Sequence, residues 1–123
     1  MSGALGLAKE ARLRSSAEFS KVLNQKSPKV WRHQDRCFRI LSAPGPKPRL
    51  GLAIAKRLMP RAVDRNRAKR LVREAFRHGQ HALPDRDYVV FARENLRHHS
   101  SKQIRHSLDQ LMRAIMSDSK THP

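Results

Sequence analysis

A run of arginine and lysine side chains between residues 65 and 77 has the residue types and spacing to bind phosphate. Successive helical residues turn by about 100°, so this run spreads cations over the arc that faces away from an apolar stripe. The planar guanidinium group suits phosphate oxygens and base edges better than an ammonium group does. The residues on this arc are Arg65, Asn66, Lys69, Arg70, Arg73 and Arg77, with Arg67 close by.

The balance of charge on this run favours binding over simple solvation. Glu74 can pair with Arg70, but one carboxylate cannot neutralise the six Arg and Lys side chains around it. A charged helix face is usually just solvated, yet the mixed signs typical of such a face are missing here. Asn66 lies between two arginines, where it could read a base or backbone group, orient its neighbours or cap the helix.

Further cations flank the run and predict a wider basic surface. Lys56 and Arg57 end the preceding strand pattern, and Arg61 lies in the loop that follows. Arg12 and Arg14 could add to the surface from the N-terminal arm. Contacts of this kind position a nucleic acid through its phosphates.

Catalytic and metal-ligating patterns are not found in the sequence. The carboxylates are scattered, and the pair Asp85 and Asp87 is typical of a strand entry. None of the seven histidines has the helical spacing to a carboxylate that a metal or nuclease site requires. We therefore predict no catalytic residue and no metal site; the histidines considered were His78, His81, His98 and His99.

Size and charge restrict the class of protein. The 123 residues fit one domain with one modest core. Lys and Arg number 27 against 10 Asp and Glu, a net charge of +17 that calls for a polyanionic partner. No apolar stretch of about 18 residues and no signal-peptide pattern is present. With Cys37 as the single cysteine, we expect a cytoplasmic protein without a membrane or an obligate protein partner.

The pattern of apolar residues predicts one α/β domain of order α-β-β-β-α-β-α. The basic helix over 65–77 carries an apolar stripe, with Asp64 as the expected N-cap and Gly79 as the expected stop. A polar linker that includes Arg86 precedes the next strand. The other expected elements are a helix over 16–24 and strands within 29–55, with imperfect alternation over 29–41 and a clear strand at 49–55. A strand over 88–92 and a last helix capped by Ser100 or Ser101 complete the order.

The expected boundaries follow from the same pattern. Residues 1–14 form a basic arm with few large apolar side chains. Residues 15–117 form the domain, and residues 118–123 form a frayed tail.

The basic run and its surroundings resemble the bacterial ribonuclease P protein family. The resemblance is carried by residues 62–77, whose core is Arg-Asn-Arg followed by Lys-Arg and Arg-Glu. It extends upstream through residues 49–57 and downstream through residues 83–90. Residues 12–23 resemble the family's N-terminal Arg-Leu and Phe-x-x-Val elements, so the likeness covers nearly the whole chain.

The resemblance implies a fold, partners and site residues. It implies a two-layer α/β sandwich with a left-handed crossover around the basic helix, which would face the catalytic RNA. Phe19 and Phe38 would line a cleft for the 5′ leader of precursor tRNA, where aromatic stacking tolerates any base. Each could instead be a core residue, and Leu23 stands where the family often has a second aromatic. Mg²⁺ would act through the RNA subunit, which performs the hydrolysis.

Two alternatives remain at the level of sequence. A basic ribosomal protein would share this size and charge. A nuclease that cleaves RNA with its own residues is the alternative among enzymes. A helix-turn-helix protein is less favoured, because strands and not a partner helix flank the basic helix.

Overall fold

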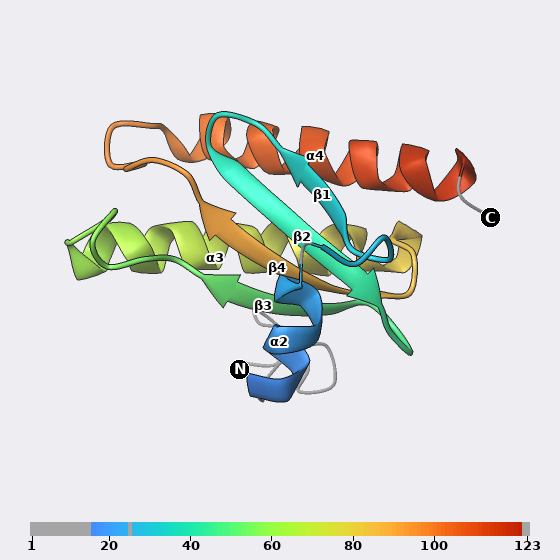
Figure 1. Ribbon diagram of the computed structural model, residues 1–123. Helices are drawn as coiled ribbons and strands as arrows, with labels where there is room; N and C mark the ends of the chain where they lie inside the picture. The colour runs from blue at the N-terminus through green and yellow to red at the C-terminus, as the bar shows by residue number, and fades with distance from the viewer. Residues whose placement is uncertain (1–15, 25, 122–123) are drawn as a thin grey trace, which may run out of the picture.

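The computed structural model describes residues 16–24 and 26–121, which form one mixed sheet with helices on both faces (Figure 1). The order α-β-β-β-α-β-α is as predicted. Within the described ranges, no helix is long and apolar enough to cross a bilayer. The elements are α2 (Ser16–Leu23), β1 (Trp31–Gln34), β2 (Phe38–Pro44), β3 (Arg49–Ala53), α3 (Ala62–Gly79), the 3-10 helix η2 (Gln80–Ala82), β4 (Arg86–Ala92) and α4 (Ser101–Thr121).

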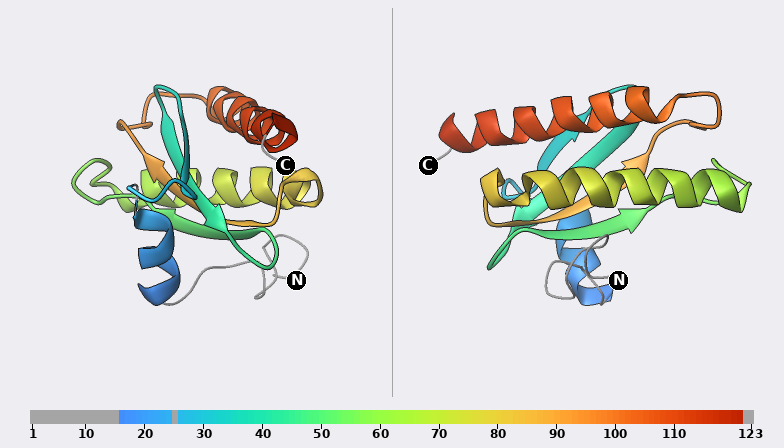
Figure 2. Two further views of the ribbon diagram at one scale, coloured as in Figure 1. Left: turned by 45° about the vertical axis from the view of Figure 1, so that its right-hand side comes forward. Right: turned by 180° about the vertical axis from the view of Figure 1, so that it is seen from behind.

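The strands lie in the order β1-β2-β4-β3. β2 pairs antiparallel with β1 and β4, whereas β3 pairs parallel with β4. The connection from β3 through α3 to β4 is left-handed, whereas nearly all crossovers between parallel strands are right-handed (Figure 2). Because β3 and β4 are parallel, the loops that follow them, residues 54–61 and 93–100, lie at the same edge of the sheet.

Alternation along the strands divides the core between the two faces of the sheet. On one face Ile40, Tyr88 and Val90 pack against α3 and α4. On the other face Leu41 and Val89 pack with residues of α2. The sheet with α3 and α4 forms the two predicted layers, and α2 partly covers the opposite face (Figures 1 and 2).

Helix α3 buries the apolar stripe that the sequence predicts, and it begins earlier than expected. Arg61 occupies the N-cap position without a side-chain cap, while Asp64 lies in the first turn. The predicted N-cap at Asp64 is therefore wrong; an acid in the first turn stabilises the helix through its dipole instead. Gly79 is the last residue of α3, as predicted. The buried stripe consists of Ala68, Leu71, Val72, Ala75 and Phe76.

Helix α4 begins at the predicted cap and runs further than expected. Gln103 N donates to Ser100 Oγ at 3.1 Å, and Ser100 N pairs with Gln103 Oε1 at 2.8 Å, which is a capping box. The helix continues to Thr121 and so extends beyond residue 117, where the sequence predicts the end of the domain. A tertiary contact explains the difference, because Asp118 Oδ2 lies 2.5 Å from Nε2 of the buried His33 in β1.

Strand β4 begins at Arg86, so the expectation of an exposed linker at this residue is wrong. The Arg86 guanidinium lies 3.7 Å from the ring centroid of Trp31 and donates to Ser42 Oγ at 3.0 Å. Burial lowers the pKa of Arg86, but guanidinium remains charged at any physiological pH. Arg86 is therefore part of the packed interior.

Candidate RNA-binding surface

The N-terminal half of α3 presents polar and cationic side chains away from the core. Asn66 and Arg70 are exposed and lie one turn apart, while Lys69, Arg73 and Arg77 are partly buried along the same helix. Asn66 lies beyond the first turn, so it does not cap the helix. Its amide and the Arg70 guanidinium are accessible to a ligand.

Two arginines of the run bind backbone groups of the neighbouring loops. Arg65 Nη1 donates to the carbonyl oxygens of Met59 and Pro60, at 2.8 Å each. Arg67 Nη2 donates to the carbonyl oxygen of Leu96 at 2.8 Å. Each guanidinium has five N–H donors, so donors remain for other partners. These contacts hold both loops against the start of α3.

Both loops add exposed cations to this edge of the sheet. Lys56, Arg57 and Arg61 lie exposed in residues 54–61, where the sequence places them. Arg93 and Arg97, exposed in residues 93–100, were not anticipated, although a loop following a strand parallel to β3 must lie at the same edge. We call these loops and the exposed flank of α3 the basic surface. Arg12 lies outside the described residues.

A groove of about 410 Å³ opens near α2, within the size range of ligand sites. Phe91 and Ala53 line it and pack against the cluster that includes residues of α2. Phe19 of α2 is partly buried against the same cluster but does not line the groove. The other lining residues are Arg39, Ala55, Arg57, Leu58, Ala92 and Arg93.

Phe38 does not line this groove, which corrects the assignment made from the family resemblance. Its side chain is 0% exposed and belongs to the core under α3 and α4. Alternation along β2 directs its neighbour Arg39 to the opposite face, where Arg39 pairs in register with Phe91 of β4. Phe91 is therefore the aromatic residue of the groove that sequence reasoning missed, because it lies in an apolar strand pattern.

Comparison with known proteins gives one consistent family. The family model described as Ribonuclease P matches residues 7–116. The ribonuclease P protein component of Cronobacter sakazakii is 37% identical over 109 residues, which cover 89% of this chain and 90% of that protein. The ribonuclease P protein component of Vibrio parahaemolyticus is 44% identical over 73 residues. These residues cover 59% of this chain and 62% of that protein, so the match spans less than two thirds of its length.

Solved structures agree with this result. The Staphylococcus aureus RNase P protein superposes with a TM-score of 0.74 at 26% identity, covering 85% of this chain and 94% of that one. The Thermotoga maritima RNase P protein superposes with a TM-score of 0.71 at 27% identity, covering 85% of this chain and 96% of that one. The match to the family model, over nearly the whole chain, places this chain in the bacterial ribonuclease P protein family.

Proposed function

We propose that this chain is the protein subunit of a ribonuclease P ribonucleoprotein. In this role it binds the catalytic RNA and the 5′ leader of precursor tRNA, and thereby assists 5′ maturation. The observation that carries the proposal is the basic surface, in which the exposed flank of α3 and two adjoining loops gather cations at one edge of the sheet. Its geometry suits an RNA backbone, and the family assignment names the RNA.

We assign the cleavage step to the RNA partner. Mg²⁺ held by that RNA would supply an activated water at the scissile phosphate. The Asp85 and Asp87 pair does not fit a protein-bound Mg²⁺, because Asp87 is fully buried and lies 2.8 Å from Arg49 and 3.1 Å from Lys21. This chain therefore contributes binding and orientation of the substrate.

Reconstitution tests the proposal directly. Precursor tRNA and Mg²⁺ are mixed with the purified protein, with the catalytic RNA, or with both. We expect cleavage at low Mg²⁺ only in the mixture that contains both subunits. Cleavage by the protein alone would establish a protein-only nuclease, and an absence of stimulation would remove the proposed role.

Arg70→Ala is expected to weaken binding to the catalytic RNA roughly tenfold, since a hydrogen bond to a charged group contributes about 1.5 kcal/mol. The slope of log affinity against log salt should fall by about one, because one phosphate contact is lost. Filter binding over a range of salt concentrations measures both quantities. Arg113→Ala, which removes an exposed arginine of α4, is the matched control. Equal losses in both variants would mean that net charge alone attracts the RNA.

Phe91→Ala is expected to weaken binding of precursor tRNA more than binding of mature tRNA, because only the precursor carries a leader. Loss of one stacked base costs about 1–3 kcal/mol, which corresponds to roughly 5-fold to 150-fold in affinity. Equilibrium binding of both tRNAs to the holoenzyme gives the ratio. Val63→Ala removes an apolar side chain that is 64% exposed outside the groove, and it should leave the ratio unchanged. An unchanged ratio in Phe91→Ala would show that the leader does not bind in this groove.

A further inference from the structure

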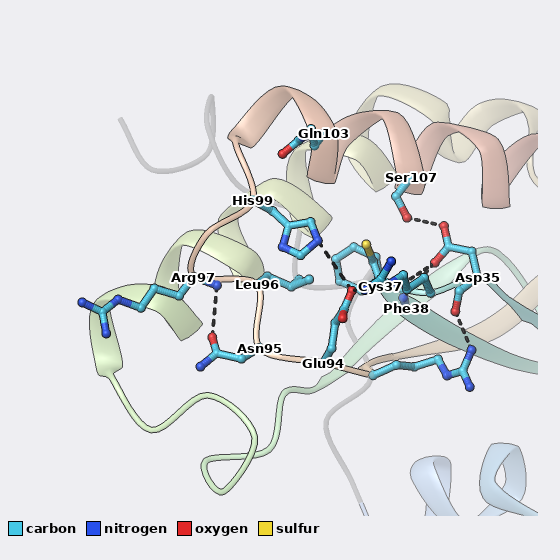
Figure 3. Close-up of polar contacts among 12 residues, drawn as sticks. Asp35, Cys37, Phe38, Glu94, Asn95, Leu96, Arg97, His99, Gln103 and Ser107 are labelled. Carbon is cyan, nitrogen blue, oxygen red and sulfur yellow. Dashed lines mark hydrogen bonds and ion pairs between the residues drawn. The ribbon is translucent and has the colours of Figure 1, made fainter.

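Three side chains with metal-ligating atoms converge between the start of β2 and the loop before α4 (Figure 3). Cys37 Sγ, a Glu94 carboxylate oxygen and a His99 ring nitrogen all lie within 4.8 Å of one another. His99 Nε2 is 3.5 Å from Glu94 Oε1. Zn²⁺ binds thiolate at about 2.3 Å and nitrogen or oxygen at about 2.0–2.2 Å, which places tetrahedral ligand atoms roughly 3.3–3.8 Å apart. Small side-chain rotations would therefore bring the three into coordination distance.

We propose that Cys37, Glu94 and His99 form a binding site for a divalent transition-metal cation, with Zn²⁺ as the best match. A sulfur, a nitrogen and an oxygen donor together favour Zn²⁺ over Mg²⁺, which takes oxygen ligands. Glu94 and His99 each have 29% of the side chain exposed, so a fourth position stays open to water. The site is separate from the Mg²⁺ that we assign to the RNA partner.

Backbone contacts hold the two ligand-bearing segments together. Arg93 N donates to the carbonyl oxygen of Cys37 at 2.8 Å, which ties the loop to β2. Leu96, between the two loop ligands, is buried in the core, and His99 N donates to its carbonyl oxygen at 3.1 Å. Arg67 of α3 donates to the same carbonyl. Glu94 and His99 thus lie on a fixed loop that is part of the basic surface, next to Cys37 at the start of β2.

The polar atoms at the site have unmet bonding capacity. Among the described residues, Glu94 Oε1 and His99 Nδ1 are buried atoms without a hydrogen-bond partner, an arrangement that costs free energy unless something satisfies them. Arg36 approaches Glu94 at 3.5 Å, but its side chain is 88% exposed, so this pair contributes little. A cation coordinated by Glu94 and His99 would compensate for their desolvation.

A role for Cys37 as a nucleophile fits the structure less well than a role as a metal ligand. Burial, followed by the carboxylate of Asp35, raises the pKa of the Cys37 thiol, so the sulfur is protonated and weakly reactive at neutral pH. A bound metal cation displaces that proton. The Asp35 carboxylate itself accepts hydrogen bonds from Cys37 N and Phe38 N, at 2.9 Å each, and fixes the start of β2.

Metal titration of the full-length, reduced and untagged protein tests the proposal. We expect one Zn²⁺ per chain, and a thiolate-to-metal charge-transfer band when Co²⁺ replaces Zn²⁺. Cys37→Ser should abolish the band. Glu94→Gln and His99→Gln should each weaken Zn²⁺ binding at least about tenfold, since loss of even an outer hydrogen-bond partner of a ligand costs that much. His98→Gln alters the adjacent, exposed histidine and should leave binding unchanged.

Two results would overturn the site. The first is equal Zn²⁺ affinity in the wild type and the Cys37→Ser variant. The second is an equal loss in His98→Gln and His99→Gln, which would indicate diffuse binding to surface histidines. Should Cys37→Ser fail to fold, the wild type still decides the question. Zn²⁺ must slow alkylation of Cys37 by iodoacetamide, and an unchanged alkylation rate would show that Cys37 does not bind the metal.

Discussion

Replacing Phe38 with alanine is expected to lower the free energy of unfolding by about 3–5 kcal/mol, the usual cost of removing a buried phenylalanine ring. The side chain is 0% exposed and belongs to the cluster that joins the sheet to α3 and α4. Truncation leaves a cavity that this packed cluster cannot fully close. Urea unfolding followed by circular dichroism gives the difference, which is large compared with the stability of a domain of this size.

The comparison with Phe91→Ala separates packing from RNA recognition. Phe91 is partly exposed at the groove, so its loss should cost less stability than the loss of Phe38. Phe38→Leu keeps most of the buried volume and should lie between the wild type and Phe38→Ala. If Phe38→Ala had the same free energy of unfolding as the wild type and yet lost the preference for precursor tRNA, Phe38 would contact the leader. Its assignment to the buried core would then be wrong.

Replacing Asp87 with alanine is expected to lower the free energy of unfolding by about 3 kcal/mol, the lower end of the range for breaking a buried ion pair. Asp87 is 0% exposed, and its carboxylate accepts hydrogen bonds from Arg49 Nε at 2.8 Å and Nη2 at 3.0 Å. Lys21 of α2 lies 3.1 Å from the same carboxylate. We choose the lower end because Lys21 is 48% exposed and regains water when the pair breaks.

Asp109→Ala is the matched control for this variant. Asp109 pairs with Arg105 one turn away on α4 at 3.2 Å, and both side chains are partly exposed. Such an i,i+4 pair contributes only about 0.3–0.5 kcal/mol. A double-mutant cycle between Asp87 and Arg49 should give a coupling well above that value. Equal losses for Asp87→Ala and Asp109→Ala would mean that the Asp87 carboxylate is solvated in solution.

The Asp87 contacts also join α2 to the face of the sheet on which the groove lies. Lys21 reaches the sheet from α2, on the face where Phe91 lines the groove. The Asp87→Ala variant, measured at a temperature where it remains folded, should therefore also lose part of the preference for precursor over mature tRNA. Binding measurements on both tRNAs check this second effect.

Local patterns in the sequence were enough to predict the order of the helices and strands and the family of the protein. The apolar stripe of α3 repeats with the helical period, so periodicity alone identifies the face that is buried. The capping box at Ser100 is a local hydrogen-bond pattern, and it marks the start of α4 correctly. The cationic run of α3 is continuous in sequence, so its exposed flank and its resemblance to the ribonuclease P protein family were predictable.

Contacts between distant segments were decided only by the tertiary structure. Alternation predicts that Phe38 and Arg39 face opposite sides of the sheet, but which side two long helices cover depends on how the chain crosses over. Arg86 and Asp87 look like solvated charges in sequence; their partners come from other strands and from α2. Cys37 and His99 are likewise far apart along the chain, and only the docking of a loop against β2 brings them together, because side-chain chemistry depends on distance in space.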